Sequence, residues 1–165
     1  MIDAIKEFFL ETVGRELCVF LCAMLPVIEL RGAIPLGAGL GLSWWQSFCL
    51  SVAGNLLPVP FLLLLLQMFL RLLRRFRLTA GVADWLEKRA LRSRERVENG
   101  AFWGLLLFVA IPLPGTGAWT GSLLASVTGI RPWKAALSIT LGVLVAGVIM
   151  TLVSYGTVAV FETWF

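Results

Sequence analysis

Hydrophobic and polar residues divide the chain into long blocks, and the period within these blocks predicts helices. In residues 1–16, apolar side chains recur every three or four positions and charged side chains occupy the opposite face. This pattern is typical of an amphipathic helix that lies in a membrane interface, and also of a helix that docks on a bundle. The sequence does not separate these two interpretations.

Four strongly apolar segments follow, and they are of two kinds. Residues 46–70 and 134–160 are long enough to cross a bilayer, which takes ~20 apolar residues. Residues 17–42 and 101–131 are interrupted by Gly and Pro, so that each of their arms is too short to span. We therefore predict two transmembrane helices and two re-entrant hairpins, each hairpin made of two short helices and a broken tip.

The second predicted hairpin is broken at 111–121, where prolines and glycines stand inside an apolar segment. Proline removes a backbone donor and disfavours helix in the residue before it, and glycine adopts conformations closed to other residues. Broken backbone survives in hydrocarbon only where it is buried in protein or lines a wet cavity. The break is therefore a candidate site, although its threonines could equally cap the next helix. The candidate residues are Pro114, Gly115, Thr116, Gly117, Trp119 and Thr120.

The first predicted hairpin carries two charged residues, Glu29 and Arg31, inside an apolar segment. Such charges are costly in a bilayer and indicate a functional site, with a structural ion pair that locks the tip as the alternative. Two residues apart, they would point to different sides of a helix, so their convergence needs unwound chain, which Gly32 and Pro35 favour. We expect half-helices to begin after Pro35 and Pro114 and to aim N–H groups at an anionic ligand beside Arg31.

Glu29 is also the obvious titratable group of the candidate site. Burial would oppose its ionisation and Arg31 would favour it, so the sequence leaves a role for protons open. Two further polar positions belong to the candidate set. Asn55 precedes two prolines in the first predicted crossing, which favours a kinked helix with a polar face, or an ordinary interhelical hydrogen bond. Arg131 stands at the exit of the second hairpin.

Residues 71–98 form the most polar stretch of the chain. They contain nine Lys and Arg residues against four Asp and Glu residues, a net charge of +5 in a chain of net charge +4. The positive-inside rule places this stretch in the cytoplasm of a cell whose inner membrane holds the protein; we expect a bacterial one. A nucleic-acid site is the weaker interpretation, because the run directly adjoins a predicted crossing and suits lipid headgroups.

Composition agrees with a membrane protein and argues against an enzyme. The chain is 59% hydrophobic and 15% charged, whereas a soluble domain has about a quarter charged residues. It has no basic segment and cleavage site of the kind found in a signal peptide. With no His and only Cys18, Cys22 and Cys49 as thiols, we expect no metal site, no cofactor and no catalytic nucleophile.

The chain also aligns with itself when it is shifted by 88 positions. Each half then has one full crossing, an odd number, so the halves would insert in opposite orientations, as in secondary transporters. The predicted fold is thus an all-α integral membrane protein: an N-terminal amphipathic helix, then an inverted repeat of re-entrant helical hairpin and transmembrane helix. The matched pairs are Pro26 with Pro114, Gly41 with Gly129, Trp45 with Trp133, and Gly54 with Gly142.

Two motifs carry a resemblance to a known family, Glu29-Leu-Arg-Gly-Ala-Ile-Pro35 and Pro112-Leu-Pro-Gly-Thr-Gly-Ala-Trp-Thr-Gly121. With both, the chain resembles the small multidrug export protein family, which is related to the DedA-like (VTT-domain) membrane proteins. The DedA-like relatives imply two facing re-entrant hairpins that translocate phospholipids or polyprenyl-phosphate carriers, coupled to an ion gradient. The resemblance also implies that the charged hairpin residues, here Glu29 and Arg31, are functional.

Three functions follow from these expectations. The first is a transporter or flippase of the DedA-like type for an amphiphile with an anionic headgroup such as a lipid phosphate, working as a homodimer among membrane lipids and without nucleic acid. The second is proton-coupled multidrug efflux, with Glu29 as the cation site. The third is a membrane scaffold whose basic segment recruits a partner.

Overall fold

A computed structural model describes residues 14–73, 94–113 and 115–164, and this part of the chain is helical without strands. The predicted amphipathic helix at 1–16 and the basic stretch at 71–98 lie largely outside the described residues. The helices are α2 (Gly14–Met24), α3 (Glu29–Gly39), α4 (Trp44–Leu56), α5 (Pro58–Leu73), α7 (Arg94–Ala110), α8 (Ala118–Thr128) and α9 (Pro132–Trp164).

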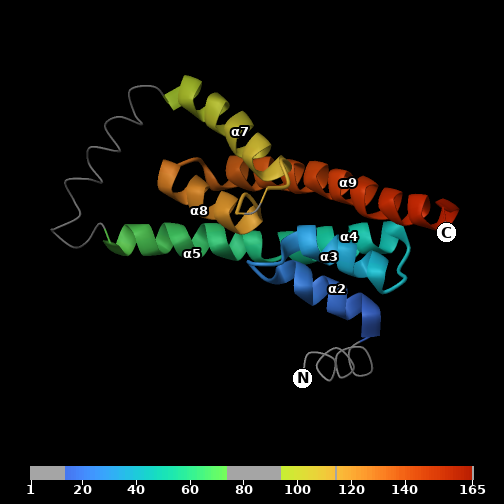
Figure 1. Ribbon diagram of the computed structural model, residues 1–165. Helices are drawn as coiled ribbons and strands as arrows, with labels where there is room; N and C mark the ends of the chain where they lie inside the picture. Colours follow the sequence, from blue (N-terminus) through green and yellow to red (C-terminus); the bar gives the residue numbers. More distant parts are fainter. Residues whose placement is uncertain (1–13, 74–93, 114, 165) are drawn as a thin grey trace.

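The helices form two hairpins held between longer helices (Figure 1). The α2–α3 hairpin opens at the end of the bundle that holds the C-terminus, and the α7–α8 hairpin opens at the other end. Both hairpins turn near the middle of the bundle. Helix α3 packs on α9, and α8 packs on α5, so each hairpin contacts the long helix of the other half of the chain.

Two helices are long and apolar enough to cross a membrane, at Trp44–Leu65 and Pro132–Thr157. The first begins with a capping box, in which the Ser43 hydroxyl accepts from the Gln46 N–H at 3.3 Å and the Gln46 side chain accepts from the Ser43 N–H at 3.1 Å. It is interrupted at Leu57, between α4 and α5, because Pro58 supplies no N–H to the helical ladder.

The outer ends of α3 and α8 are built in the same way. After α3, Gly41 has φ +76° and the Leu42 N–H donates to the Gly37 carbonyl at 3.0 Å. After α8, Gly129 has φ +71° and the Ile130 N–H donates to the Ala125 carbonyl at 3.2 Å. Each of these residues lies 88 positions after its counterpart, and glycine suits both turns because only it adopts positive φ without strain.

The first arm of each hairpin approaches its long helix through glycine. A Cβ atom on Gly54 would meet the carbonyl oxygen of Phe20 in α2, and one on Gly142 would meet the carbonyl oxygen of Leu106 in α7. These two glycines are again 88 positions apart. The close approach explains why α2 lies tightly on α4 and α7 on α9.

The tip of the first hairpin lies earlier than the sequence indicated. The chain turns at 25–28, where Pro26 follows α2, and α3 then runs without interruption through Pro35. The predictions of an unwound segment at 29–35 and of a half-helix beginning after Pro35 were therefore wrong. The physical reason is that one proline removes only one bond from a helical turn, whereas Pro26 combines with the positive φ of Glu29 (51°) to redirect the chain.

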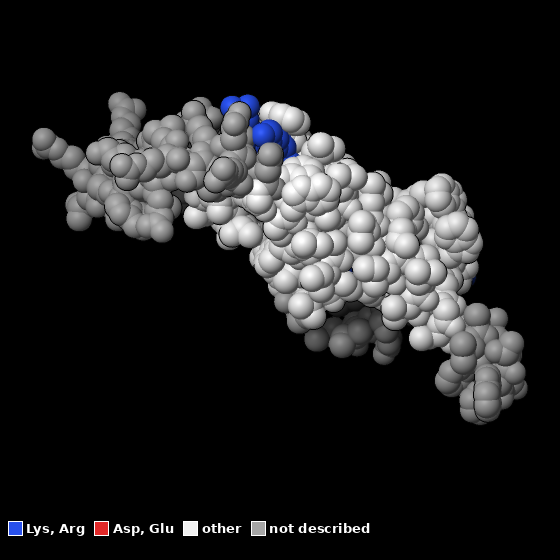
Figure 2. All heavy atoms as spheres, turned by 90° about the horizontal axis from the view of Figure 1, so that it is seen from above, with Lys and Arg blue, Asp and Glu red and all other residues white. Residues whose placement is uncertain are grey.

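Exposed charged side chains in the described part of the chain lie toward the ends of the bundle, with Arg15 and Glu16 at the start of α2 and Arg131, beside the half-buried Lys134, at the opposite end. Figure 2 shows a face whose described atoms are almost all uncharged, with Lys and Arg atoms gathered in one place. Arg131 and Lys134 stand at the start of α9, at the end of the bundle where α5 ends and α7 begins. The uncharged remainder is what a surface facing lipid requires.

Candidate functional site

Glu29 lies where the two hairpin tips meet, and its carboxylate caps helix α8. Oε1 accepts a hydrogen bond from the Trp119 backbone N–H at 3.3 Å, and the side chain is only 5% exposed. Gly117 makes room for the carboxylate, because a Cβ atom on Gly117 would occupy the position of Oε2. The first N–H groups of a helix lack partners inside the helix, so a carboxylate from the other half of the chain stabilises this end.

Glu29 is also the single described non-glycine residue with a positive φ. That conformation is uncommon for residues with a side chain and is found where surrounding structure enforces it. Here it turns the chain at the tip and points the carboxylate toward α8.

Arg31 binds the broken tip of the second hairpin with both terminal nitrogens. Nη1 donates to the Leu113 carbonyl, and Nη2 donates to the Thr116 carbonyl at 2.7 Å and to its hydroxyl at 2.9 Å. A longer contact of 3.4 Å joins Nη2 to the Ile111 carbonyl. The carbonyls of this tip lie outside any helix, and the guanidinium adds charged donors to those that the tip itself supplies.

Trp119 makes the reciprocal contact. Its indole Nε1–H donates to the Met24 carbonyl at 3.1 Å, at the C-terminal end of α2. Trp119 lies 88 positions after Arg31, and each of the two side chains donates to backbone carbonyls of the opposite hairpin near its turn. We call these contacts of Glu29, Arg31 and Trp119 the tip latch.

Most of the predicted site residues contribute to this latch. The Thr116 hydroxyl also donates to the Leu113 carbonyl at 2.9 Å, and the Thr120 hydroxyl donates to the Gly117 carbonyl at 3.3 Å. Gly115 turns the tip with φ +85°. The structure thus brings together Glu29, Arg31, Thr116, Gly117, Trp119 and Thr120, as the sequence predicted.

Other predicted residues stand apart from the latch. Arg131 is at the far end of α8, eleven helical residues beyond Gly117 and thus about 16 Å away along the axis. Gly32 faces Ile28 across the turn, and Pro35 is exposed on α3. Pro114 lies outside the described residues.

Asn55 is fully buried in α4, and its environment differs from that of the latch residues. Neither its amide oxygen nor its amide nitrogen has a hydrogen-bond partner among the residues that the structure describes. The same holds for the hydroxyl of Ser51, one turn earlier on the same face and also fully buried. Buried polar groups are almost always paired, so this pair marks an unusual position.

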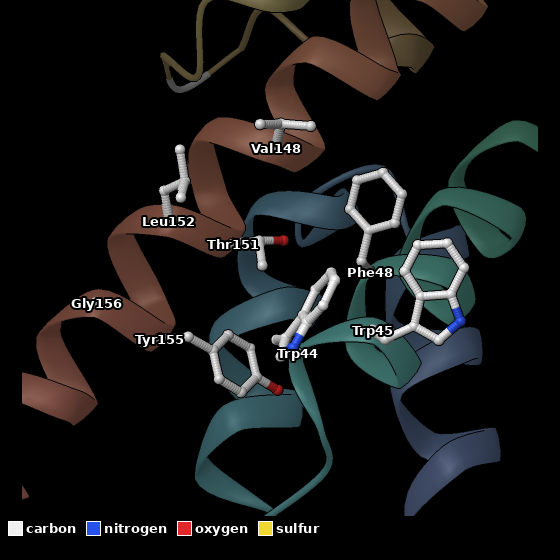
Figure 3. Close-up of a pocket in the computed structure, with 8 residues that line it drawn as sticks. All are labelled: Trp44, Trp45, Phe48, Val148, Thr151, Leu152, Tyr155 and Gly156. Carbon is white, nitrogen blue, oxygen red and sulfur yellow. The ribbon is translucent and has the colours of Figure 1, made fainter.

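A cavity of about 430 Å³ lies between the start of α4 and the end of α9 (Figure 3). Trp44, Trp45 and Phe48 form one wall and Leu152 and other α9 residues form the other. The hydroxyl of Tyr155 is turned to the Leu42 carbonyl (2.8 Å) and the Ser47 hydroxyl (2.5 Å), so it does not make the cavity polar.

The sequence analysis did not identify Tyr155, Ser47 or Ser51. The signal for Tyr155 was available, since it is the one tyrosine of the chain and lies within an apolar helix. The serines gave no signal, because serine is common in transmembrane helices and bonds its own backbone there. In the described part of the chain, no group of three His, Cys, Asp or Glu residues could hold a metal ion.

Comparison with known proteins gives the family. Residues 29–149, well over half of the chain, match the family model described as "Putative small multi-drug export protein". The chain belongs to this family. It is accordingly a helical membrane protein whose family name indicates export, and Glu29, Arg31 and Trp119 fall inside the matched range. No curated protein and no solved structure matches the chain.

Proposed function

We propose that this member of the small multi-drug export family is a DedA-like transporter, or flippase, for amphiphiles with an anionic headgroup. In the proposed architecture, α2–α3 and α7–α8 are re-entrant hairpins of an inverted repeat. The tip latch is the observation that supports this most directly. Arg31 and Trp119, 88 positions apart, each donate to backbone carbonyls of the opposite hairpin, which is consistent with a two-fold relation between inverted halves.

The latch also suggests how an anionic headgroup would be recognised. The Arg31 guanidinium and the N-terminal N–H groups of α8 are both suited to a phosphate or carboxylate. In the closed arrangement, tip carbonyls occupy the guanidinium and the Glu29 carboxylate occupies the helix end. An incoming anion would reach both donors by displacing Glu29 from α8 and the tip carbonyls from Arg31.

Protons fit the same scheme. A protonated Glu29 carries no charge to hold at the positive end of α8, so protonation would weaken its contact with the Trp119 N–H and favour exchange for a substrate anion. Deprotonation would restore the closed latch. We therefore propose that Glu29 couples headgroup release to proton movement.

The proposal includes the setting of the protein. The predicted cytoplasmic position of the basic residues would put the end of the bundle near Arg131 inside a bacterial cell and the aromatic cavity near the outer surface. Two crossings enclose little volume, and α9 exposes Leu152 (69%) and Val153 (54%), so we propose a homodimer. No chemical reaction is assigned to the protein.

A second candidate, proton-coupled efflux of lipophilic cations, is favoured by the family name and by the aromatic cavity. Trp44, Trp45 and Phe48 present ring faces of the kind that attract organic cations. In this alternative the cavity, rather than the latch, would select the substrate.

Reconstitution distinguishes these candidates. Purified protein in proteoliposomes would be supplied with a fluorescent lipid phosphate or with lipophilic cations, and flux would be compared between wild type, Glu29→Gln and Arg31→Lys. We expect loss of lipid-phosphate flux in both variants, with insertion and fold retained. The control is Thr140→Val, whose hydroxyl bonds only the Ala136 carbonyl of its own helix.

Each other outcome identifies another function. Cation flux that depends on the aromatic cavity, with no lipid-phosphate flux, would support efflux. Wild-type protein that moves neither class of compound would favour the scaffold, whose test is neutralisation of Arg89, Arg92, Arg94 and Arg96.

A further inference from the structure

A second polar site, separate from the tip latch, lies at the C-terminal end of α4. Ser51 and Asn55 are four residues apart, so their side chains are neighbours on one face of the helix. Both residues are fully buried, yet the Ser51 hydroxyl and both amide atoms of Asn55 have no partner among the described residues. The equivalent positions 88 residues later are Ile139 and Val143, also fully buried. Packing in this fold therefore accepts apolar side chains at these positions.

A backbone oxygen joins the same face. Pro58 has no N–H, so the Gly54 carbonyl lacks the helical donor that it would otherwise have four residues later. On the helix, this carbonyl points along the axis toward the break at Leu57, next to the backbone of Asn55. The end of α4 thus holds three neutral oxygen atoms that could serve as ligands: a hydroxyl, an amide and a carbonyl.

The chemistry of these atoms favours a positive ligand. The Ser51 hydroxyl, the Asn55 amide oxygen and the Gly54 carbonyl all carry lone pairs that can face a cation, and they lie at the one-residue break before α5 begins at Pro58. The last turns of α2 lie against the same place, since a Cβ atom on Gly54 would meet both the Phe20 carbonyl and the Ala23 side chain. The last turn of α2 therefore lies beside the break between α4 and α5, close to Asn55. In membrane transporters, carbonyls at such helix ends and breaks coordinate monovalent cations.

The depth of this position is that of the hairpin tips. Helices α3 and α4 run antiparallel (Figure 1). Gly37 contacts Ser47 close to the loop that joins the two helices. Eight residues from that contact along α3 is Glu29, and eight residues along α4 is Asn55. Both helices rise about 12 Å over eight residues, so Asn55 and Glu29 lie at the same level.

We infer that Ser51, Asn55 and the Gly54 carbonyl form a binding site for a monovalent alkali cation. The neutral ligands match a single charge, because a divalent ion in a buried site calls for carboxylates. The site does not depend on the proposed function, since binding requires no substrate and no flux.

The test uses full-length protein in nanodiscs and measures equilibrium binding of radioactive sodium, with potassium, lithium and choline as competitors. We expect saturable binding that one alkali ion displaces and choline does not. Asn55→Val, which installs the residue type of the equivalent position 143, should reduce the affinity at least tenfold. Asn55→Asp keeps an oxygen ligand and adds charge, so it should bind more tightly. Ser122→Ala is the control, because that buried hydroxyl already donates to the Ala118 carbonyl at 2.7 Å.

Thermal unfolding provides the second measurement. Binding to the folded state alone raises the Tm as ligand concentration increases. We expect sodium or potassium to raise the Tm of wild type relative to choline chloride at equal ionic strength, and not that of Asn55→Val. A wild type that binds neither ion, or an Asn55→Val protein with unchanged affinity, overturns the inference. If Asn55→Val fails to fold, an unchanged affinity in Asn55→Asp overturns it instead. If the Tm of wild type does not change with the cation, and the Tm of Asn55→Val is higher than that of wild type, the site holds only water and the inference is overturned.

Discussion

Replacing Gly117 with alanine tests the tip latch through a single methyl group. The φ of Gly117 is −97°, which alanine adopts without strain, so the substitution introduces no backbone strain. The added Cβ would fall on the Glu29 carboxylate, which must then leave the N-terminus of α8. The Trp119 N–H and a carboxylate that is 5% exposed would both lose their partner.

The size of the effect follows from that lost contact. A hydrogen bond to a charged group contributes ~1.5–3 kcal/mol to stability. In a protein of this length, 1 kcal/mol corresponds to ~2–4 °C of Tm. We therefore expect Gly117→Ala to lower the Tm by ~3–12 °C, measured by thermal unfolding of purified protein in detergent. Gly104→Ala in α7 is the control, because a Cβ atom there meets nothing within 4 Å and alanine favours helix.

A double-mutant cycle with Glu29→Ala isolates the mechanism. Alanine is a poorer N-cap than glycine, and the cycle cancels that intrinsic cost because it is present in both backgrounds. Without the Glu29 side chain, Gly117→Ala should cost only a small part of its wild-type penalty. If the two substitutions were additive, the carboxylate would not be what Gly117 accommodates, and our account of the latch would fail.

Three further substitutions test other contacts by the same Tm measurement. Trp119→Phe should cost ~0.5–1.5 kcal/mol, because it removes the donor to the Met24 carbonyl and keeps most of the ring; an unchanged Tm would contradict that contact. Tyr155→Phe removes the donor to the Leu42 carbonyl and the acceptor for the Ser47 hydroxyl and should cost ~1–3 kcal/mol, and a smaller loss would mean that water replaces it. Gly54→Ala and Gly142→Ala should each lower the yield of folded protein, since backbone oxygens stand where the methyl groups would go; normal yield and Tm would refute the close approach.

The lengths of the apolar segments were enough to predict the order of the helices. Two long segments became the helices at Trp44–Leu65 and Pro132–Thr157, and two interrupted segments became short hairpins. Segment length is a strong constraint because the backbone must be satisfied internally wherever lipid surrounds it. The same constraint explains why the second tip was found where its prolines and glycines cluster.

The first tip was harder to locate because two prolines competed for it. Pro26 and Pro35 flank the charged residues, and local propensity alone does not say which one ends a helix. The outcome depends on contacts with the other half of the chain: Glu29 reaches α8 only if the turn precedes it. No pattern within 17–42 contains that information.

The partners of the charged residues were equally beyond the sequence. Glu29 and Arg31 were expected to bind each other or a ligand, and in the structure they instead contact opposite sides of the second tip. The sequence shows two opposite charges two residues apart and so suggests that they pair. It does not show that a carbonyl 82 positions away becomes the partner of Arg31 after folding. For Asn55, the sequence showed a polar residue in an apolar helix. It could not show that the buried amide would have no hydrogen-bond partner among the described residues.

The latch itself limits what could open it. Separation of the tips would remove the hydrogen bonds of Arg31 to the second tip and would take from the Thr116 carbonyl its charged donor. A ligand shifts such an equilibrium only by its difference in affinity between the two states. A neutral or cationic compound offers the freed guanidinium nothing in return, whereas an anionic headgroup forms charge-assisted bonds that replace those lost. Opening at the latch therefore favours anions, and any cation that the protein exports would have to bind elsewhere, with the aromatic cavity as the described alternative.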